Sequence, residues 1–134
     1  MKTIFTILLL IAATDLFAPE AGLLPVLDPD PVNPYQELWE ATCFVESTCN
    51  PDTINAYEQA YGIAQIRQIR IDDYNNRTGS HYSLYDCLDS TTARKIYMYY
   101  ASKYGPMDLE TIARRWNGSG PMTEEYWEKI KINL

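Results

Sequence analysis

Apolar residues recur at helical spacing along most of the chain after residue 33. The first such segment is predicted to form a helix from Pro34 to Thr48. Asn33 is expected to be its N-cap, with proline at the first helical position and Gln36 completing a capping box. The helix should end before Asn50-Pro51, because the residue before a proline disfavours helical backbone. Its apolar stripe consists of Leu38, Ala41, Thr42 and Val45.

Further helices are predicted in the middle of the chain. One lies near Gly62 to Tyr74, and a short helical turn follows Ser83. Asp89 or Ser90 is expected to cap the next helix, which ends at Gly105-Pro106. The core-facing stripe of that helix consists of Ala93, Ile96, Tyr97, Tyr100 and Ala101.

Two more helices complete the pattern, so the fold class is predicted to be mainly α. Asp108 should cap a helix, and Thr123 should begin the closing one. The positions that support them are Leu109, Ile112, Ala113 and Trp116 at core spacing, Glu124 and Glu125 in the last helix's first turn, and Lys129 and Lys131 in its last. No alternating strand pattern of useful length competes, although a small β-hairpin between Asn50 and Tyr61 is compatible with the sequence.

The first 33 residues are not expected to belong to this domain. Lys2 precedes an apolar run and small residues, which is typical of a secretory signal peptide over residues 1–18. Cleavage after Ala18 and cleavage after Ala13 are both open, as is an uncleaved signal anchor. Residues 19–33 are rich in proline and aspartate and are interpreted as a linker. A single domain over residues 34–134, with a periplasmic or secreted location, is therefore predicted.

Charge is unevenly distributed. The chain has a formal net charge of −7, and it carries no Lys or Arg between Pro19 and Ile66. Nucleic-acid binding depends on Lys and Arg contacts to phosphate, so no nucleic-acid partner is predicted. Binding to anionic membrane surfaces is disfavoured for the same reason. A polar, weakly charged polysaccharide is compatible with this balance.

Three cysteines follow the predicted signal peptide. Cys43 is interpreted as a small buried apolar residue, and Cys49–Cys87 is the favoured pair if a disulfide forms, with the pairing left open. His81 is the only histidine, and no Cys-x-x-Cys spacing occurs. No metal site and no cofactor are therefore predicted.

Glu46 is the strongest candidate for chemistry. It lies near the end of the first predicted helix, and a turn-rich loop separates it from the step Gly62-Ile63-Ala64-Gln65-Ile66 into the next apolar segment. This order predicts a cleft in which a carboxyl group is half-buried among neutral hydrogen-bonding groups. Such an environment raises a carboxyl pKa and suits the group to general acid work on a glycosidic oxygen.

Three motifs in this order resemble those of the lysozyme-like fold of lytic transglycosylases and goose-type lysozymes, especially the small secreted bacterial and phage domains. They are Glu46-Ser47-Thr48-Cys49-Asn50-Pro51, the Gly-x-x-Gln-Ile step at 62–66, and Trp116-Asn117-Gly118. The resemblance covers the chain from about Tyr35 to its end and implies that 34–134 is a lysozyme-like catalytic domain with Glu46 as the catalytic acid. The residues predicted to bind substrate are Ser47, Asn55, Glu58, Tyr61, Gln65, Trp116 and Asn117.

The chain departs from the family pattern at three places. Ala64 replaces the usual Met before the glutamine, Trp116 replaces a Tyr, and Asn55 stands near the place of a cleft serine. Structural interpretations also stay open: Gln65 as a partner of backbone groups, Trp116 as a core residue, and Asn117 as a left-handed helix cap. These departures concern the fit of the substrate more than the chemistry.

The resemblance implies cleavage of the β-1,4 bond between N-acetylmuramic acid and N-acetylglucosamine in peptidoglycan. One carboxyl group is enough in a lytic transglycosylase, where Glu46 acts as acid and then as base and leaves 1,6-anhydromuramyl ends. The first alternative is a two-carboxylate lysozyme that pairs Glu46 with Glu58, although Glu58 can also be a solvent-facing loop acid. The others are a catalytically silent peptidoglycan-binding module and a structural scaffold of an envelope assembly. The implied partners are peptidoglycan and an envelope-spanning secretion, conjugation or phage assembly.

Overall fold

A computed structural model of the chain describes residues 33–105 and 108–134. The predicted signal peptide and the linker up to residue 32 lie outside the described residues, as does Pro106. The described residues form one compact unit. In these two ranges, no helix has the length and apolar character needed to cross a membrane.

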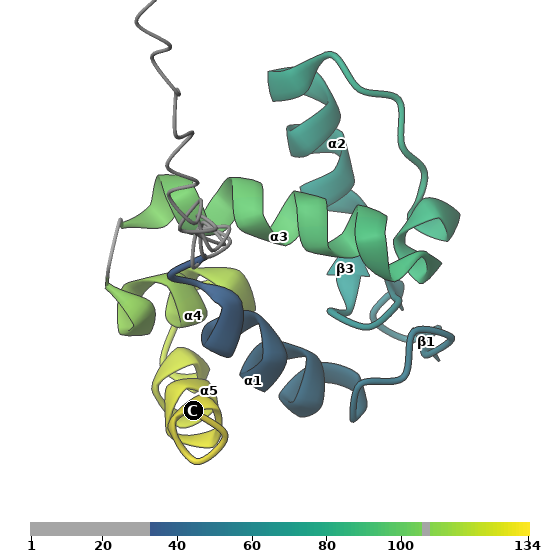
Figure 1. The fold of residues 1–134 in the computed structure, drawn as a ribbon. Coiled ribbons are helices and arrows are strands. Elements are labelled where there is room, and N and C mark those ends of the chain that lie inside the picture. Colours follow the sequence, from purple (N-terminus) through teal and green to yellow (C-terminus); the bar gives the residue numbers. More distant parts are fainter. Residues whose placement is uncertain (1–32, 106–107) are drawn as a thin grey trace, which may run out of the picture. The chain divides into compact units, whose positions relative to one another are not determined.

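The described part of the chain is mainly helical, as predicted (Figure 1). It contains five α-helices, one 3-10 helix and three two-residue strands. In chain order these are α1 (Gln36–Ser47), β1 (Ile54–Asn55), β2 (Ala60–Tyr61), β3 (Ile66–Arg67), α2 (Gln68–Thr78), η1 (Leu84–Leu88), α3 (Ser90–Tyr104), α4 (Leu109–Asn117) and α5 (Met122–Lys131).

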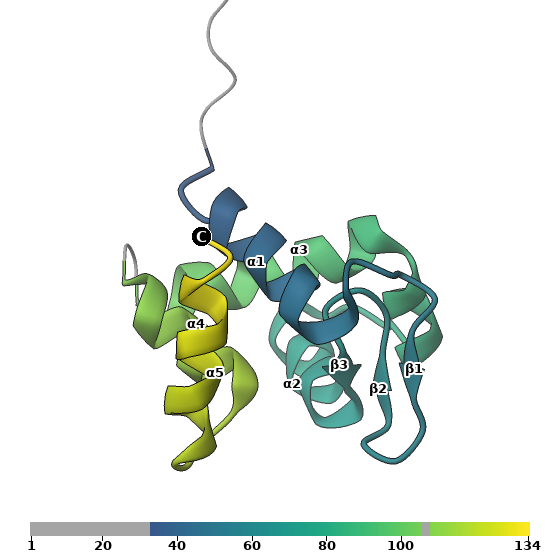
Figure 2. The same cartoon turned by 90° about the horizontal axis from the view of Figure 1, so that it is seen from below.

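Helix α3 runs through the centre of the unit and connects its two sides. On one side it packs against α4, which in turn packs against α5, while α5 also contacts α1 (Figure 2). On the other side it packs against η1, which contacts β2 and β3. The strands form an antiparallel sheet in the order β1-β2-β3, and α2 begins directly after β3. A helical side and a sheet side therefore face each other across the C-terminal end of α1.

Aromatic side chains hold the centre of the helical side together. Tyr97 is fully buried on α3, with its ring centroid 5.1 Å from that of Trp39 and 4.7 Å from that of Trp116. Its hydroxyl lies 3.0 Å from the hydroxyl of Thr42, so the buried polar atoms are paired. Each such aromatic pair contributes about 0.5–1.5 kcal/mol beyond its buried area. All five residues of the predicted α3 stripe are buried.

The start of α1 differs from the prediction. The helix begins at Gln36, and the predicted capping box is not formed. The Asn33 side-chain oxygen instead accepts from the backbone N–H of Tyr35 at 3.0 Å. The Gln36 side chain donates to Glu40 at 2.6 Å and accepts from Arg94 of α3 at 2.7 Å. The Gln36 side chain therefore binds Arg94 of another helix and does not form the predicted local cap.

The predicted boundaries of the second helix were also wrong, because α2 begins at Gln68 rather than near Gly62. The compatible hairpin is present, but a third strand extends it. Ile66 pairs with Tyr61, and Arg67 pairs with Ala60. Ile66 is buried. An inward-facing position on a strand buries it, and an inward-facing position on a helix would bury it equally well. A short apolar run does not distinguish the two by periodicity alone.

The predicted starts of the next helices are confirmed. Ser83 and Asp86 form a capping box at η1. Asp89 accepts from the backbone N–H of Thr92 at the start of α3, and Asp108 accepts from Thr111 at the start of α4. Helix α5 begins at Met122, one residue before the expected Thr123, and carries its acidic and basic residues at the predicted ends.

The three cysteines are all free. Cys43 is buried, as predicted, but Cys87 is buried too, whereas Cys49 is exposed just after α1. The bridge that was favoured between Cys49 and Cys87 is therefore not formed, because Cys87 faces the core. Burial raises the pKa of the Cys43 and Cys87 thiols to about 12, so both are neutral and unreactive.

Candidate active site

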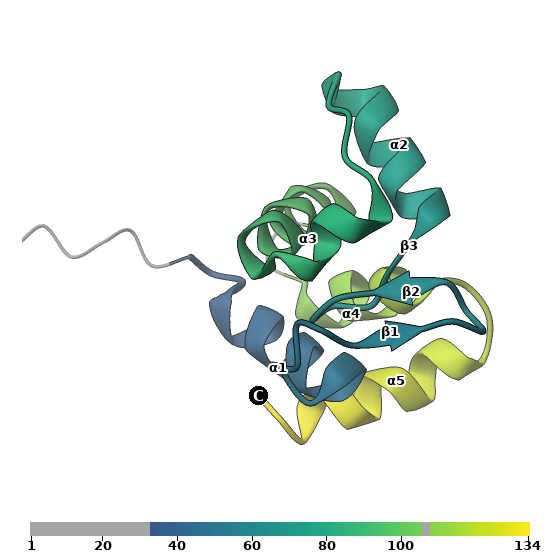
Figure 3. The same cartoon turned by 90° about the vertical axis from the view of Figure 1, so that its right-hand side faces the viewer.

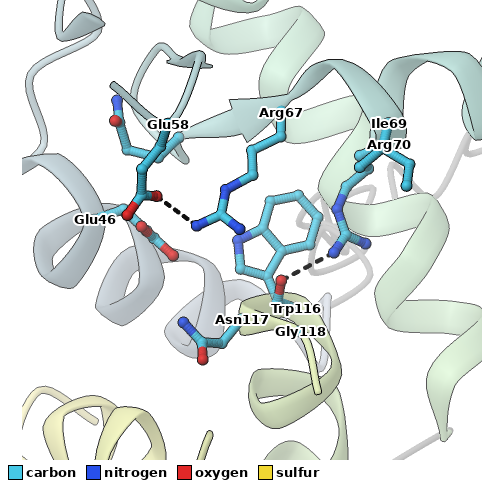
Figure 4. Close-up of a pocket in the computed structure, with 9 residues that line it drawn as sticks. Glu46, Glu58, Arg67, Ile69, Arg70, Trp116, Asn117 and Gly118 are labelled. Carbon is cyan, nitrogen blue, oxygen red and sulfur yellow. Dashed lines mark hydrogen bonds and ion pairs between the residues drawn. The ribbon is translucent and has the colours of Figure 1, made fainter. Parts of the chain in front are cut away.

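A cleft of about 160 Å³ lies where the helical side meets the sheet side. Glu46 enters it from the end of α1, and Trp116 and Asn117 enter it from the end of α4 (Figure 4). Figure 3 shows the end of α1 beside the hairpin. The complete lining is Glu46, Glu58, Gln65, Arg67, Ile69, Arg70, Trp116, Asn117 and Gly118.

Glu46 is half-buried in this cleft, and its pKa is raised to about 7. Removal of its carboxyl group from water is the largest cause, since burial disfavours the charged form. A hydrogen bond from Tyr126 and the charges of Arg67 and Arg70 act in the opposite direction, while Glu58 adds to the rise. Near neutral pH this carboxyl group can therefore both give and take a proton, as a general acid–base residue must.

Tyr126 fixes the orientation of Glu46 and was not predicted from the sequence. Its hydroxyl donates to Oε1 of Glu46 at 2.8 Å. The ring is buried on α5, and burial together with Glu46 raises the pKa of the phenol well above its usual range. The phenol therefore stays protonated and donates to the ionised carboxylate of Glu46. The two residues are 80 positions apart, so only the packing of α5 against α1 brings them together.

Glu58 and Arg67 form an ion pair on the sheet side of the cleft (Figure 4). Their side chains are 44% and 50% exposed, so water competes with the contact. Asn55 supports the loop, because its side-chain oxygen accepts from the backbone N–H of Glu58 at 3.1 Å. Figure 4 shows the carboxylate of Glu58 facing the same space as that of Glu46.

Gln65 shapes the turn between β2 and β3. Its side-chain nitrogen donates to the backbone oxygens of Gly62 at 2.8 Å and Thr53 at 3.1 Å. Gly62 has φ +79°, and a Cβ there would lie 1.9 Å from the backbone oxygen of Cys87. Only glycine fits at this position. The Gly-x-x-Gln-Ile motif therefore builds the sheet side, and Gln65 lines the cleft with its amide nitrogen bound to backbone.

Arg70 and Trp116 close one end of the cleft. The guanidinium carbon of Arg70 lies 4.3 Å from the ring centroid of Trp116, and Arg70 donates to the Trp116 backbone oxygen at 2.9 Å. Trp116 is 6% exposed, which leaves no open face for a sugar ring. Asn117 is the last residue of α4 and lines the cleft, while the cap with positive φ is Gly118.

Three of the residues predicted to bind substrate lie outside the lining. Ser47 donates to the backbone oxygen of Ile63 at 2.8 Å and so ties α1 to the sheet side. Asn55 holds the hairpin loop as described, and Tyr61 packs edge-on against Tyr85 at 5.5 Å. These contacts give all three a structural role near the cleft.

No group of three or more His, Cys, Asp or Glu side chains that could hold a metal ion occurs among residues 33–105 and 108–134. Comparisons of the chain with protein-family models, curated proteins and solved structures find no match. One oriented carboxyl group with a pKa near neutrality, beside polar groups and two guanidinium groups, is suited to proton transfer on a polar substrate.

Proposed function

We propose that this protein is a lytic transglycosylase with a lysozyme-like fold. It cleaves the β-1,4 bond between N-acetylmuramic acid and N-acetylglucosamine in peptidoglycan. Opening the wall locally in this way suits a periplasmic or secreted enzyme that serves a secretion, conjugation or phage assembly.

The observation that carries the proposal is the state of Glu46. It lies at the helix end that the motif Glu46 to Pro51 predicted, it faces a cleft, and its pKa is raised to about 7. A solvated surface glutamate does not have a pKa raised in this way. Raised carboxyl pKa values are the usual device by which glycosidases keep a general acid protonated near neutral pH.

The proposed reaction uses Glu46 twice. The protonated carboxyl group first gives its proton to the glycosidic oxygen as the bond to the muramyl C1 breaks. The N-acetyl carbonyl oxygen of the same sugar stabilises the positive charge at C1. The Glu46 carboxylate then removes the proton of the 6-hydroxyl, whose oxygen bonds to C1 and closes the 1,6-anhydro ring. Glu46 ends protonated, and no water is consumed.

A two-carboxylate lysozyme is the second candidate, because Glu58 lines the same cleft. Glu58 is half exposed on the loop between β1 and β2, whereas Glu46 is held by the buried hydroxyl of Tyr126. The anhydro product is favoured over hydrolysis because a base that activates water has to be held in position, and only Glu46 of the two carboxyl groups has a buried partner in the described residues.

A catalytically silent binding module is disfavoured, because two departures from the family pattern, Ala64 and Asn55, lie outside the cleft lining. Ala64 is fully buried and outside the cleft lining, and Asn55 supports the hairpin loop. Neither departure removes a group from the cleft itself. The chemical groups that the proposed reaction needs are therefore unaffected by them.

Clearing of purified peptidoglycan suspensions tests the proposal. The Glu46→Gln variant is expected to lose at least about 100-fold of the wild-type rate, since general acid–base catalysis contributes about 10²–10⁴-fold. Glu40→Gln is the matched control, because Glu40 is an exposed glutamate on the same helix. Equal clearing by the wild type and Glu46→Gln would contradict the proposal.

A further inference from the structure

The cleft carries more positive charge than the chain around it. The chain has a net charge of −7 and no Lys or Arg from Pro19 to Ile66, yet Arg67 and Arg70 both line the cleft. The lining also holds two carboxyl groups, one of which is Glu46. When Glu46 is protonated, two guanidinium groups face a single carboxylate, that of Glu58. The cleft is then locally cationic in an acidic protein.

Arg70 is held by contacts within the fold. It donates to the hydroxyl of Tyr104 at 2.7 Å and to the backbone oxygen of Trp116 at 2.9 Å. Its guanidinium carbon also lies 4.8 Å from the ring centroid of Tyr100. These contacts tie α2 to α3 and α4. Arg70 therefore acts as a clamp between helices rather than as a ligand for substrate.

Arg67 is placed differently. Its side chain is 50% exposed, and its guanidinium group contacts the carboxylate of Glu58 on the same wall of the cleft (Figure 4). The contact uses one nitrogen, Nη2, of a group that has five N–H donors in a planar fork. An exposed ion pair of this kind contributes about 0–1 kcal/mol, so a substrate carboxylate can compete with Glu58 for it. A guanidinium group binds a carboxylate in a two-pronged geometry that a sugar hydroxyl does not match.

We propose that Arg67 is a specificity-determining residue that binds a carboxylate of the substrate next to the scissile bond, in exchange for Glu58. This inference rests on the proposed function, in which muramic acid supplies the carboxylate. Its source is either the free lactyl group of a glycan without peptides or the first carboxylate of a peptide stem. Arg67 thereby distinguishes muramyl glycans from uncharged N-acetylglucosamine polymers.

Binding measured by calorimetry tests this role without turnover, in the full chain carrying Glu46→Gln. The probes are a peptide-free tetrasaccharide of alternating N-acetylglucosamine and N-acetylmuramic acid, the same glycan with its lactyl groups converted to carboxamides, and the tetrasaccharide with peptide stems. Adding Arg67→Gln is expected to weaken binding of a carboxylate glycan about tenfold, which corresponds to about 1.4 kcal/mol. Binding of the carboxamide should change less than about twofold. Arg67→Lys, which keeps the charge, should recover part of the loss.

Arg77→Gln is the matched control, because Arg77 forms an ion pair of similar exposure with Asp73 on α2, outside the cleft lining. It should leave the binding of every glycan unchanged. A tenfold loss for the peptide-free glycan supports the proposal and identifies the lactyl group as the source of the carboxylate. A tenfold loss only for the stem-bearing glycan also supports it and identifies the peptide stem as the source. An equal loss for acid and carboxamide, or no loss, overturns the role of Arg67 while leaving the proposed function intact if the wild type clears peptidoglycan. A parent protein that binds none of the glycans, together with a wild type that clears nothing, overturns both.

Discussion

The two walls of the cleft are built by different means. On the helical wall, Glu46 is held by Tyr126 and backed by the aromatic core around Tyr97. On the sheet wall, Glu58 and Arg67 stand on two-residue strands and their loop, and their side chains are about half exposed. The proposed catalytic group, Glu46, is thus placed by buried contacts, while Arg67, which is proposed to contact substrate charge, lies in an exchangeable ion pair. A fixed position suits a group that transfers protons, and an exchangeable contact suits a group that binds substrate.

The largest stability effect is expected at Gly62 in the sheet wall, where the backbone passes close to Cys87. Alanine there would place Cβ 1.9 Å from the Cys87 backbone oxygen and would also have to adopt φ +79°. We expect Gly62→Ala to lower the free energy of unfolding by at least about 3 kcal/mol, or to prevent folding. Gly79→Ala is the control, because Gly79 has φ +71° but nothing within 4 Å of the added Cβ, so it should cost about 1–2 kcal/mol. Equal losses in urea titrations would mean that the close approach to Cys87 is not real.

Glu46 should make the helical wall less stable as the pH rises. Its native pKa of about 7 lies above the ordinary value of 4.5, so the native state binds the proton more tightly than the unfolded chain does. Between those two values stability should therefore fall with rising pH. Glu46→Gln should abolish this fall and raise the free energy of unfolding at pH 8 by on the order of 2 kcal/mol, after allowance for partial exposure. Unfolding curves of both proteins at pH 5 and pH 8 measure it, and a variant that is less stable at pH 8 would contradict the burial of Glu46.

Tyr126 should set the upper pH limit of activity. Its hydroxyl stabilises the ionised form of Glu46, so Tyr126→Phe should raise the pKa of Glu46 further and move the alkaline limb of kcat/KM to higher pH. The lost hydrogen bond to a charged group should cost about 1.5 kcal/mol of stability at pH 8. Tyr97→Phe is the control, since it removes a buried hydroxyl that binds Thr42. If the two variants shift the alkaline limb equally, the contact with Glu46 is not responsible.

The smallest effect is expected from the ion pair on the sheet wall. A double-mutant cycle with Glu58→Gln and Arg67→Gln should give a coupling free energy of about 0.5 kcal/mol or less, because both side chains are about half exposed. The coupling should shrink further at high salt. A coupling of several kcal/mol would mean that the pair is rigid and cannot open for a substrate.

The contrast between the walls also explains what the sequence could predict. The caps at Asp89 and Asp108 and the stripe of α3 are local signals, and the structure confirms them. Placing Glu46 at a helix end depended on the same local pattern. The third strand was missed because Ile66 fits a strand and a helix equally well over so short a run.

The contacts that complete the site are tertiary, and local periodicity does not encode them. Tyr126 meets Glu46 across 80 positions. The only sequence signal for it was an aromatic residue on the apolar face of the last helix, which predicts burial but not a partner. Likewise, nothing in the pattern indicated that Arg67 would bind Glu58, nine positions away, since that contact requires the β2–β3 turn to be in place.

Mass spectrometry of the muropeptides released from purified peptidoglycan tests the central claim most directly. If Glu46 alone carries the chemistry, the products should end in 1,6-anhydromuramic acid and be one water lighter than reducing ends. Glu58→Gln should then still form them. Reducing ends from the wild type, together with loss of activity in Glu58→Gln, would contradict the account and show that Glu58 activates water as the second carboxylate of a lysozyme.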